Sequence, residues 1–168
     1  MSSPFALPRK PVPLSPWNGW SPVPIRLIVG FGFMAHGYAK VVHGPDAFAG
    51  VVAAMGMPAP SVLSWTTIMV EILGGLAVLC GVLIPFVSLP MAAVLIVAMA
   101  TVHWPYGFSS ITLQSFSPAG AKFGPPGYEV DLLYLFGLIS LVLSGPGPFS
   151  VPVRLRFRCL ESFAQEAR

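Results

Sequence analysis

The sequence predicts an all-α membrane protein, a four-helix transmembrane bundle with a short interfacial helix between its first and second spans. Two observations support this fold class. The first is composition: 55% of the 168 residues are hydrophobic and only 9% are charged, against about 25% charged residues in an average soluble domain. The second is a series of apolar runs, each close to the roughly twenty residues that a helix needs to cross a bilayer core.

The apolar runs set the expected elements. The spans are expected at residues 23–42, 61–82, 86–103 and 127–144. Residues 46–56 are too short to span, but they carry apolar side chains at i, i+3, i+4 and i+7, which are Phe48, Val51, Val52 and Met55. This spacing indicates a helix that lies flat on the membrane or folds back over the bundle. Residues 104–126, rich in Ser, Gly and Pro, are expected to form a long loop.

Three segments follow from this division: a proline-rich tail at 1–22, a membrane domain at 23–148 and a basic tail at 149–168. An even number of spans puts both ends on one side of the membrane. That side holds seven of the nine basic residues, whereas the other holds only Lys40 and Lys122. The positive-inside rule therefore predicts that both termini are cytoplasmic. The net charge of +3 lies at the chain ends, and it does not indicate a nucleic-acid partner.

Ionisable residues inside the expected spans are the candidate functional residues. His36 and Lys40 are four positions apart and share one helix face, and Glu71 lies near the middle of the second span. His103 ends the third span and Glu129 begins the fourth. In the expected orientation all five lie in the outer half of the membrane, where a bundle would bring them to one pocket. Ionisable groups in hydrocarbon are costly and usually face a protein interior or a wet cavity.

Each of these residues also has a purely structural interpretation, as a hydrogen bond or ion pair that holds the helices together. For Glu71 we expect a partner in Lys40 or His36, or a protonated side chain that donates a hydrogen bond. Asp131 is two positions from Glu129, so we expect it on another helix face in a structural role. The functional interpretation is favoured because chance would scatter such residues over both halves of the membrane.

Two kinds of chemistry suit histidines and carboxylates in a bundle. Both are metal ligands, but no helix carries the Glu-x-x-His pair of di-iron bundles, so the question of a metal stays open. A quinone needs hydrogen-bond donors at its carbonyls and a group that exchanges protons. His36, Lys40 and Glu71 supply both, and His103 and Glu129 would line the entrance. Ring contacts to a quinone are expected from Phe31, Phe33, Trp65 and Trp104.

Short motifs along the chain resemble the DoxX family of bacterial four-helix membrane proteins. They occur in the family's order over residues 24–150 and are Arg26-Leu27, His36-Gly37-x-x-Lys40, Glu71-x-x-Gly74-Gly75, Val102-His103 with Gly107-Phe108, Gly127-Tyr128-Glu129 and Ser144-Gly145-Pro146-Gly147. The resemblance implies a bundle in the bacterial inner membrane. The family includes DoxD-type subunits of a thiosulfate:quinone oxidoreductase, so it also implies a place in membrane redox chemistry.

We therefore expect a quinone-reactive subunit of a membrane oxidoreductase, with quinone as its cofactor. The sequence has no flavin or dinucleotide motif, so the electron donor is expected on a partner subunit. The two cysteines are far apart, which argues against a thiol–disulfide enzyme. Two alternatives remain: a non-catalytic anchor or assembly subunit, and a small-molecule carrier that uses the same pocket without electron transfer.

Overall fold

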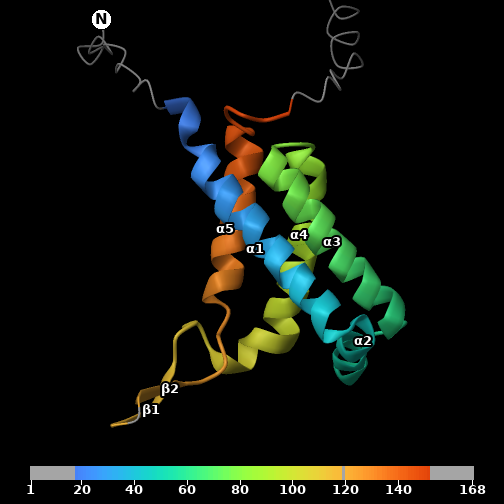
Figure 1. Cartoon of the computed structure of the whole chain (residues 1–168), viewed down its shortest axis with the longest axis vertical. Coiled ribbons are helices and arrows are strands. Elements are labelled where there is room, and N and C mark those ends of the chain that lie inside the picture. The colour runs from blue at the N-terminus through green and yellow to red at the C-terminus, as the bar shows by residue number, and fades with distance from the viewer. Residues whose placement is uncertain (1–17, 119, 152–168) are drawn as a thin grey trace, which may run out of the picture.

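A computed structural model of the chain describes residues 18–118 and 120–151. Most of the proline-rich tail and of the basic tail therefore lies outside the described residues. Four long helices form a bundle (Figure 1), and they are α1 (Pro22–His43), α3 (Pro60–Cys80), α4 (Ile84–Ala98) and α5 (Glu129–Ser144). The shorter elements are η1 (Asn18–Trp20), α2 (Pro45–Ala54), the π-helical turn η2 (Met99–His103), the 3-10 turn η3 (Trp104–Tyr106) and the strands β1 (Leu113–Ser117) and β2 (Gly120–Phe123).

Three helical segments are long and apolar enough to cross a membrane, and they are Pro22–His43, Pro60–Cys80 and Ile84–Tyr106. The fourth helix, α5, has 16 residues, which gives it a length of about 24 Å. It packs against α1 and α4 and so completes the bundle. Large apolar side chains point outward, as at Leu89, which is 73% exposed. The predicted all-α membrane bundle is confirmed.

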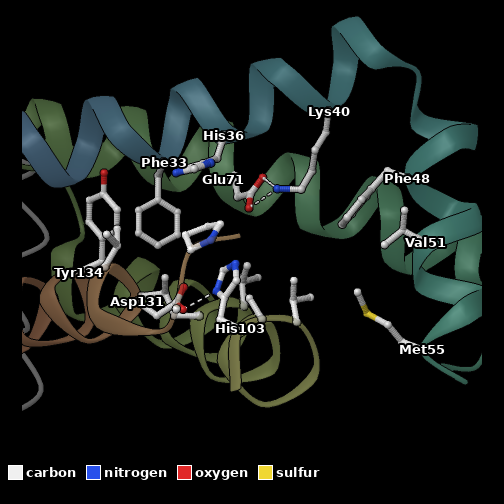
Figure 2. A pocket seen from close by; sticks show the side chains of 17 residues that line it. Phe33, His36, Lys40, Phe48, Val51, Met55, Glu71, His103, Asp131 and Tyr134 are labelled. Carbon is white, nitrogen blue, oxygen red and sulfur yellow. Dashed lines mark hydrogen bonds and ion pairs between the residues drawn. The ribbon is translucent and has the colours of Figure 1, made fainter. Parts of the chain in front are cut away.

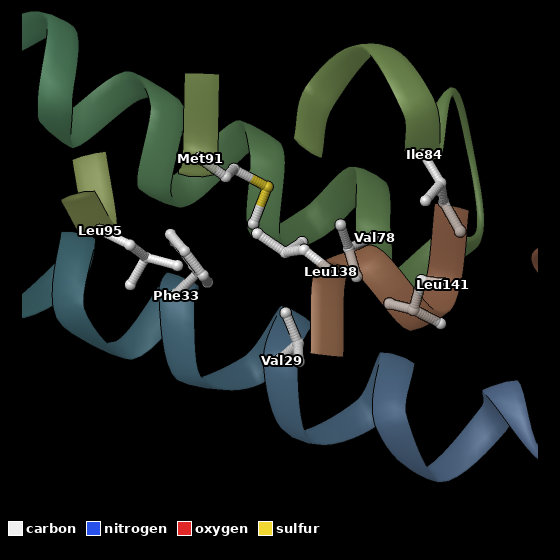
Figure 3. Close-up of a cluster of buried hydrophobic side chains, with 8 residues drawn as sticks. All are labelled: Val29, Phe33, Val78, Ile84, Met91, Leu95, Leu138 and Leu141. Carbon is white, nitrogen blue, oxygen red and sulfur yellow. The ribbon is translucent and has the colours of Figure 1, made fainter. Parts of the chain in front are cut away.

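The apolar core lies between the four long helices (Figure 3). Its members are Val29, Phe33, Val78, Ile84, Met91, Leu95, Leu138 and Leu141. α1 and α3 cross closely through glycines, because a Cβ at Gly30 would lie 2.8 Å from the Gly75 carbonyl oxygen. α1 and α4 each pack on α3 and α5. They consequently face each other across the bundle.

The first and last described residues lie at the same end of the bundle, which we call the terminal end (Figure 1). The opposite end carries α2 and the hairpin, and we call it the α2 end. At the terminal end the rings of Trp20 and Phe149 meet edge to face, with centroids 5.3 Å apart. The chain therefore crosses the bundle an even number of times, as the sequence predicts.

Arg26 is buried at the terminal end and only 5% exposed. Its guanidinium donates hydrogen bonds to backbone carbonyls from two other parts of the chain. The acceptors and donor–acceptor distances are Pro146 (2.6 Å), Pro148 (3.0 Å), Leu79 (2.9 Å) and Phe149 (3.3 Å). This carbonyl clasp joins the start of α1 to the end of α3 and to the segment after α5.

The interfacial helix folds back over the bundle, which is one of the two placements that the sequence allows. α2 packs against α3 and α1 and buries Ala49 and Val52. The buried hydroxyl of Ser64 on α3 donates a hydrogen bond to the Pro45 carbonyl at 2.8 Å and fixes the start of α2. The expected loop at 104–126 differs from the prediction, because β1 and β2 form an antiparallel hairpin within it.

Candidate functional site

A cavity of about 490 Å³ lies at the α2 end of the bundle (Figure 2). That volume is within the range of about 300–1,000 Å³ typical of small-ligand sites. Apolar side chains from α1, α2, α4 and η2 form most of its wall, among them Phe33, Phe48, Val51, Met55 and Val102. Its polar residues are His36, Lys40, Glu71, His103, Asp131 and Tyr134.

The first polar pair of the cavity joins α1 to α3. Lys40 Nζ donates to both carboxylate oxygens of Glu71, at 2.7 Å and 2.6 Å, and the two side chains are 21% and 6% exposed. Gly37, one turn before Lys40, allows the helices to approach here, because a Cβ at this position would lie 2.7 Å from Cγ1 of Ile72. Lys40 Nζ also lies 5.0 Å from the centre of the Phe48 ring on α2. The expected pairing of Glu71 with Lys40 is confirmed.

The second polar pair joins η2 to α5. His103 Nδ1 lies 2.5 Å from Asp131 Oδ2, and the side chains are 27% and 9% exposed. The π-helical turn η2 sets the direction of His103, and such turns are frequent at functional sites. The carboxylate engages Nδ1, so Nε2 is the ring nitrogen available to a ligand. Asp131 lies on a different face of α5 from Glu129, as expected, but that face is the one that lines the cavity.

Two short segments at the base of the hairpin hold η2 and α5 together. The backbone amides of residues 127–129 donate to the carbonyls of residues 107–109. A side chain at Gly127 would not fit, since a Cβ there would lie 2.7 Å from the Ser109 carbonyl oxygen. Glu129 Oε2 accepts a hydrogen bond from the Ser110 amide at 3.0 Å. Glu129 therefore stabilises this joint and does not line the cavity, so the structure does not place it at the expected entrance.

Of the four aromatic residues expected to contact a quinone, one lines the cavity. Phe33 is buried and lines it, whereas Phe31, Trp65 and Trp104 do not. Trp65 is half exposed on α3. The Trp104 ring stacks on Tyr128 with centroids 5.3 Å apart and planes 17° from parallel. Trp104 thus belongs to the joint below the hairpin.

His36 and Tyr134 complete the polar side of the cavity. The two rings lie 6.5 Å apart, nearly perpendicular, and the Tyr134 ring also meets Phe33 edge to face at 5.6 Å. The Tyr134 hydroxyl lies against the backbone of Gly32, where a side chain would clash. The sequence analysis missed Tyr134, although its spacing of three from Asp131 places both on one face of α5.

Comparison with known proteins identifies the family of this chain. The DoxX family profile matches residues 21–104, half of the chain. The chain belongs to the DoxX family. It is also 30% identical over 141 residues to the uncharacterized membrane protein Rv3486 of Mycobacterium tuberculosis (strain ATCC 25618 / H37Rv), a match that covers 80% of each chain. No solved structure matches the chain significantly.

The DoxX-matched segment holds most of the polar residues of the cavity, namely His36, Lys40, Glu71 and His103. Asp131 and Tyr134 come from α5, beyond that segment. Figure 2 shows the Lys40–Glu71 pair and the His103–Asp131 pair on opposite sides of the cavity. In this DoxX protein, hydrogen-bond donors and proton-exchanging groups therefore lie on two sides of the space that a bound molecule would occupy. Within the described ranges, no group of three or more His, Cys, Asp or Glu side chains is placed to hold a metal ion.

Proposed function

We propose that this DoxX protein is the quinone-reactive membrane subunit of an oxidoreductase. The observation that carries the proposal is the pair of opposed ion pairs, Lys40–Glu71 and His103–Asp131, in one otherwise apolar cavity. A quinone head is a flat apolar ring with a carbonyl at each end, which corresponds to this distribution of polar groups. The cavity volume of about 490 Å³ accommodates such a ring.

The residues have distinct roles in this proposal. Lys40 and His36 donate hydrogen bonds to one carbonyl of the head, and His103 donates from Nε2 to the other. Glu71 and Asp131 accept hydrogen bonds from Lys40 and His103, hold these side chains at the cavity and relay protons to it. Phe33 contacts the face of the ring. A quinone that is reduced takes up electrons together with protons, and these side chains deliver the protons.

The electrons come from a protein partner in this proposal. The sequence has no flavin or dinucleotide motif, so the donor's redox cofactor belongs to another subunit. The hairpin is one candidate docking surface, because it projects away from the bundle and Phe116 on it is 82% exposed. In the proposed orientation, with both termini in the cytoplasm, the cavity lies in the outer half of the inner membrane and the hairpin projects from its outer face.

The proposal is tested by quinone binding to the purified protein and its variants. Wild-type protein should bind a benzoquinone, and His36→Ala should weaken binding about tenfold through loss of one hydrogen bond. His43→Ala is the matched control, because His43 is on the same helix but bonds the carbonyl of Ala39 at 2.7 Å and does not line the cavity. A wild-type protein that binds no quinone, or equal binding by His36→Ala, would contradict the proposal.

A second candidate function is that of a non-catalytic anchor or assembly subunit. It is favoured by one observation: both ion pairs satisfy their partners within the chain, so neither needs a ligand. The double variant His36→Ala/Glu71→Gln separates the two functions when the partner complex is isolated from native membranes. Intact assembly with lost quinone reduction favours the quinone subunit, whereas loss of assembly favours the anchor.

A further inference from the structure

We infer that a crevice between α3 and α4 binds the hydrocarbon chain of the ligand whose polar head occupies the central cavity. The inference rests on the proposed function and deepens it, because it specifies the substrate class as a quinone with an apolar chain. It also predicts the route by which that chain leaves the bundle.

The crevice is a second cavity of about 300 Å³ that adjoins the central one. Its own lining residues come mainly from the α2 ends of α3 and α4 and include Leu63, Thr67, Val70, Ala93 and Val97. The two cavities share six lining residues, which are Lys40, Met55, Glu71, Val94, Ala98 and Val102. The Lys40–Glu71 pair therefore stands at the junction, where a polar head would meet an apolar chain.

The chemistry of the crevice suits a hydrocarbon chain. Its only charged lining residues are Lys40 and Glu71 at the junction, and these bond each other. The Thr101 hydroxyl donates to the Val97 carbonyl of its own helix at 2.7 Å, so its hydrogen bond is already made. Ala93 and Val97 are exposed on the outer side of α4. The crevice thus opens sideways, toward the surface that faces lipid in a membrane.

The crevice exists because α3 and α4 are close at one level and separate beyond it. Met91 packs directly on Gly74, where a Cβ would lie 2.9 Å from the methionine sulfur. The helices are antiparallel neighbours, so the next turns toward the α2 end place Thr67 opposite Ala98. Both of these side chains are short and line the crevice. A chain lying there would fill space that the protein leaves open.

The position of the crevice beside the central cavity favours one occupant. A phospholipid chain could enter from the side, but its headgroup would have to remain outside the bundle. A chain attached to a head in the central cavity must leave that cavity, and the crevice adjoins it and opens toward the lipid-facing surface. We therefore assign the crevice to the chain of the head-bound ligand.

The test compares two probes with one head, 2,3-dimethoxy-5-methyl-benzoquinone with and without a decyl chain, titrated in the same detergent. Ala93→Phe overfills the crevice without touching the central cavity, which Ala93 does not line. This variant should weaken binding of the decyl probe about tenfold by steric exclusion and leave the chainless probe unaffected. Leu89→Phe, one turn away on α4 and lining neither cavity, is the matched control and should bind both probes as wild type does.

The outcomes separate this inference from the proposed function. Equal binding of the decyl probe by Ala93→Phe and wild type would overturn the chain site while leaving the head site intact. If neither probe binds the wild-type protein, the proposed function fails and the chain site fails with it. Equal weakening of both probes by Ala93→Phe would show that the substitution disturbs the head site, and it too would overturn the assignment.

Discussion

At the scale of single residues, the polar side chains of the cavity act in pairs. Lys40 neutralises Glu71 and His103 holds Asp131, so each carboxylate in this apolar setting has a cationic or hydrogen-bonding partner. A buried charge that loses its partner is strongly destabilising, because the remaining group stays desolvated without compensation. The pairs are therefore expected to show coupling when mutated together.

Lys40→Met should destabilise the protein more than the double variant Lys40→Met/Glu71→Gln. Breaking a buried pair costs about 3–5 kcal/mol, and we expect the lower part of that range since the Lys40 side chain is 21% exposed. Thermal unfolding in detergent measures both variants. Lys122→Met on the exposed hairpin is the control and should leave the midpoint unchanged. A double variant no more stable than the single would show that the two residues are not coupled.

Some contacts at the cavity could be predicted from the sequence, and others could not. The sequence limited the state of Glu71 to a pair with Lys40, a pair with His36 or a protonated side chain, because Lys40 and His36 lie at a similar depth in the neighbouring helix. The structure shows the pair with Lys40. The sequence could not predict in the same way which of Glu129 and Asp131 lines the cavity. The rotation of α5 about its axis depends on the contacts of residues 107–109 with residues 127–129, and no periodicity in the sequence reports them.

At the scale of elements, glycine positions decide how closely the helices pack. Gly37 brings α1 against α3 at the level of Glu71. The same contact places Lys40 within reach of the carboxylate. The motif His36-Gly37-x-x-Lys40 therefore combines two side chains that line the cavity with the glycine that positions them.

Gly37→Ala should lower stability by about 1–3 kcal/mol, because an added Cβ at 2.7 Å from Ile72 forces α1 away from α3. Gly50→Ala is the matched control, since Gly50 is also within a helix and a Cβ there meets nothing within 4 Å. That control should be neutral or stabilising by up to about 1 kcal/mol through helix propensity. Chemical or thermal unfolding provides the comparison, and a neutral Gly37→Ala would contradict the close-packing argument.

Element prediction from the sequence was good for the helices and poor for the connection at 104–126. Long apolar runs with proline and glycine at their ends define the helices. β1 and β2 have five and four residues, all exposed, so burial imposed no alternating pattern by which they could be recognised. The π-helical turn η2 was also invisible, because it continues α4 without any break in hydropathy.

At the scale of the whole molecule, the polar cavity and the buried arginine lie at opposite ends of the bundle. The start of α1 and the segment after α5 meet at Arg26, whereas α2 and the hairpin lie at the end that holds the cavity. Because the two ends of the bundle differ, the orientation of the bundle in the membrane decides from which side the cavity is reached. If both termini are cytoplasmic, as the sequence predicts, the cavity is reached from the outer half of the bilayer.

Cysteine labelling of intact cells checks the orientation. In a Cys80→Ala background, Ser117→Cys on the exposed hairpin should react with a membrane-impermeant maleimide added from outside. The native Cys159 should react only after the membrane is permeabilised, and it serves as the internal control. The reverse pattern would place the cavity on the cytoplasmic side and invert the predicted topology.

The carbonyl clasp of Arg26 has a consequence for how the chain is made. Arg26 belongs to the first long helix to emerge from the ribosome, whereas three of its four acceptors, Pro146, Pro148 and Phe149, follow it by 120 residues or more. Until the segment after α5 is in place, the guanidinium lacks these acceptors. The clasp therefore closes only after that segment has joined the bundle, and we expect a chain that ends before residue 146 to be less stable than the full chain.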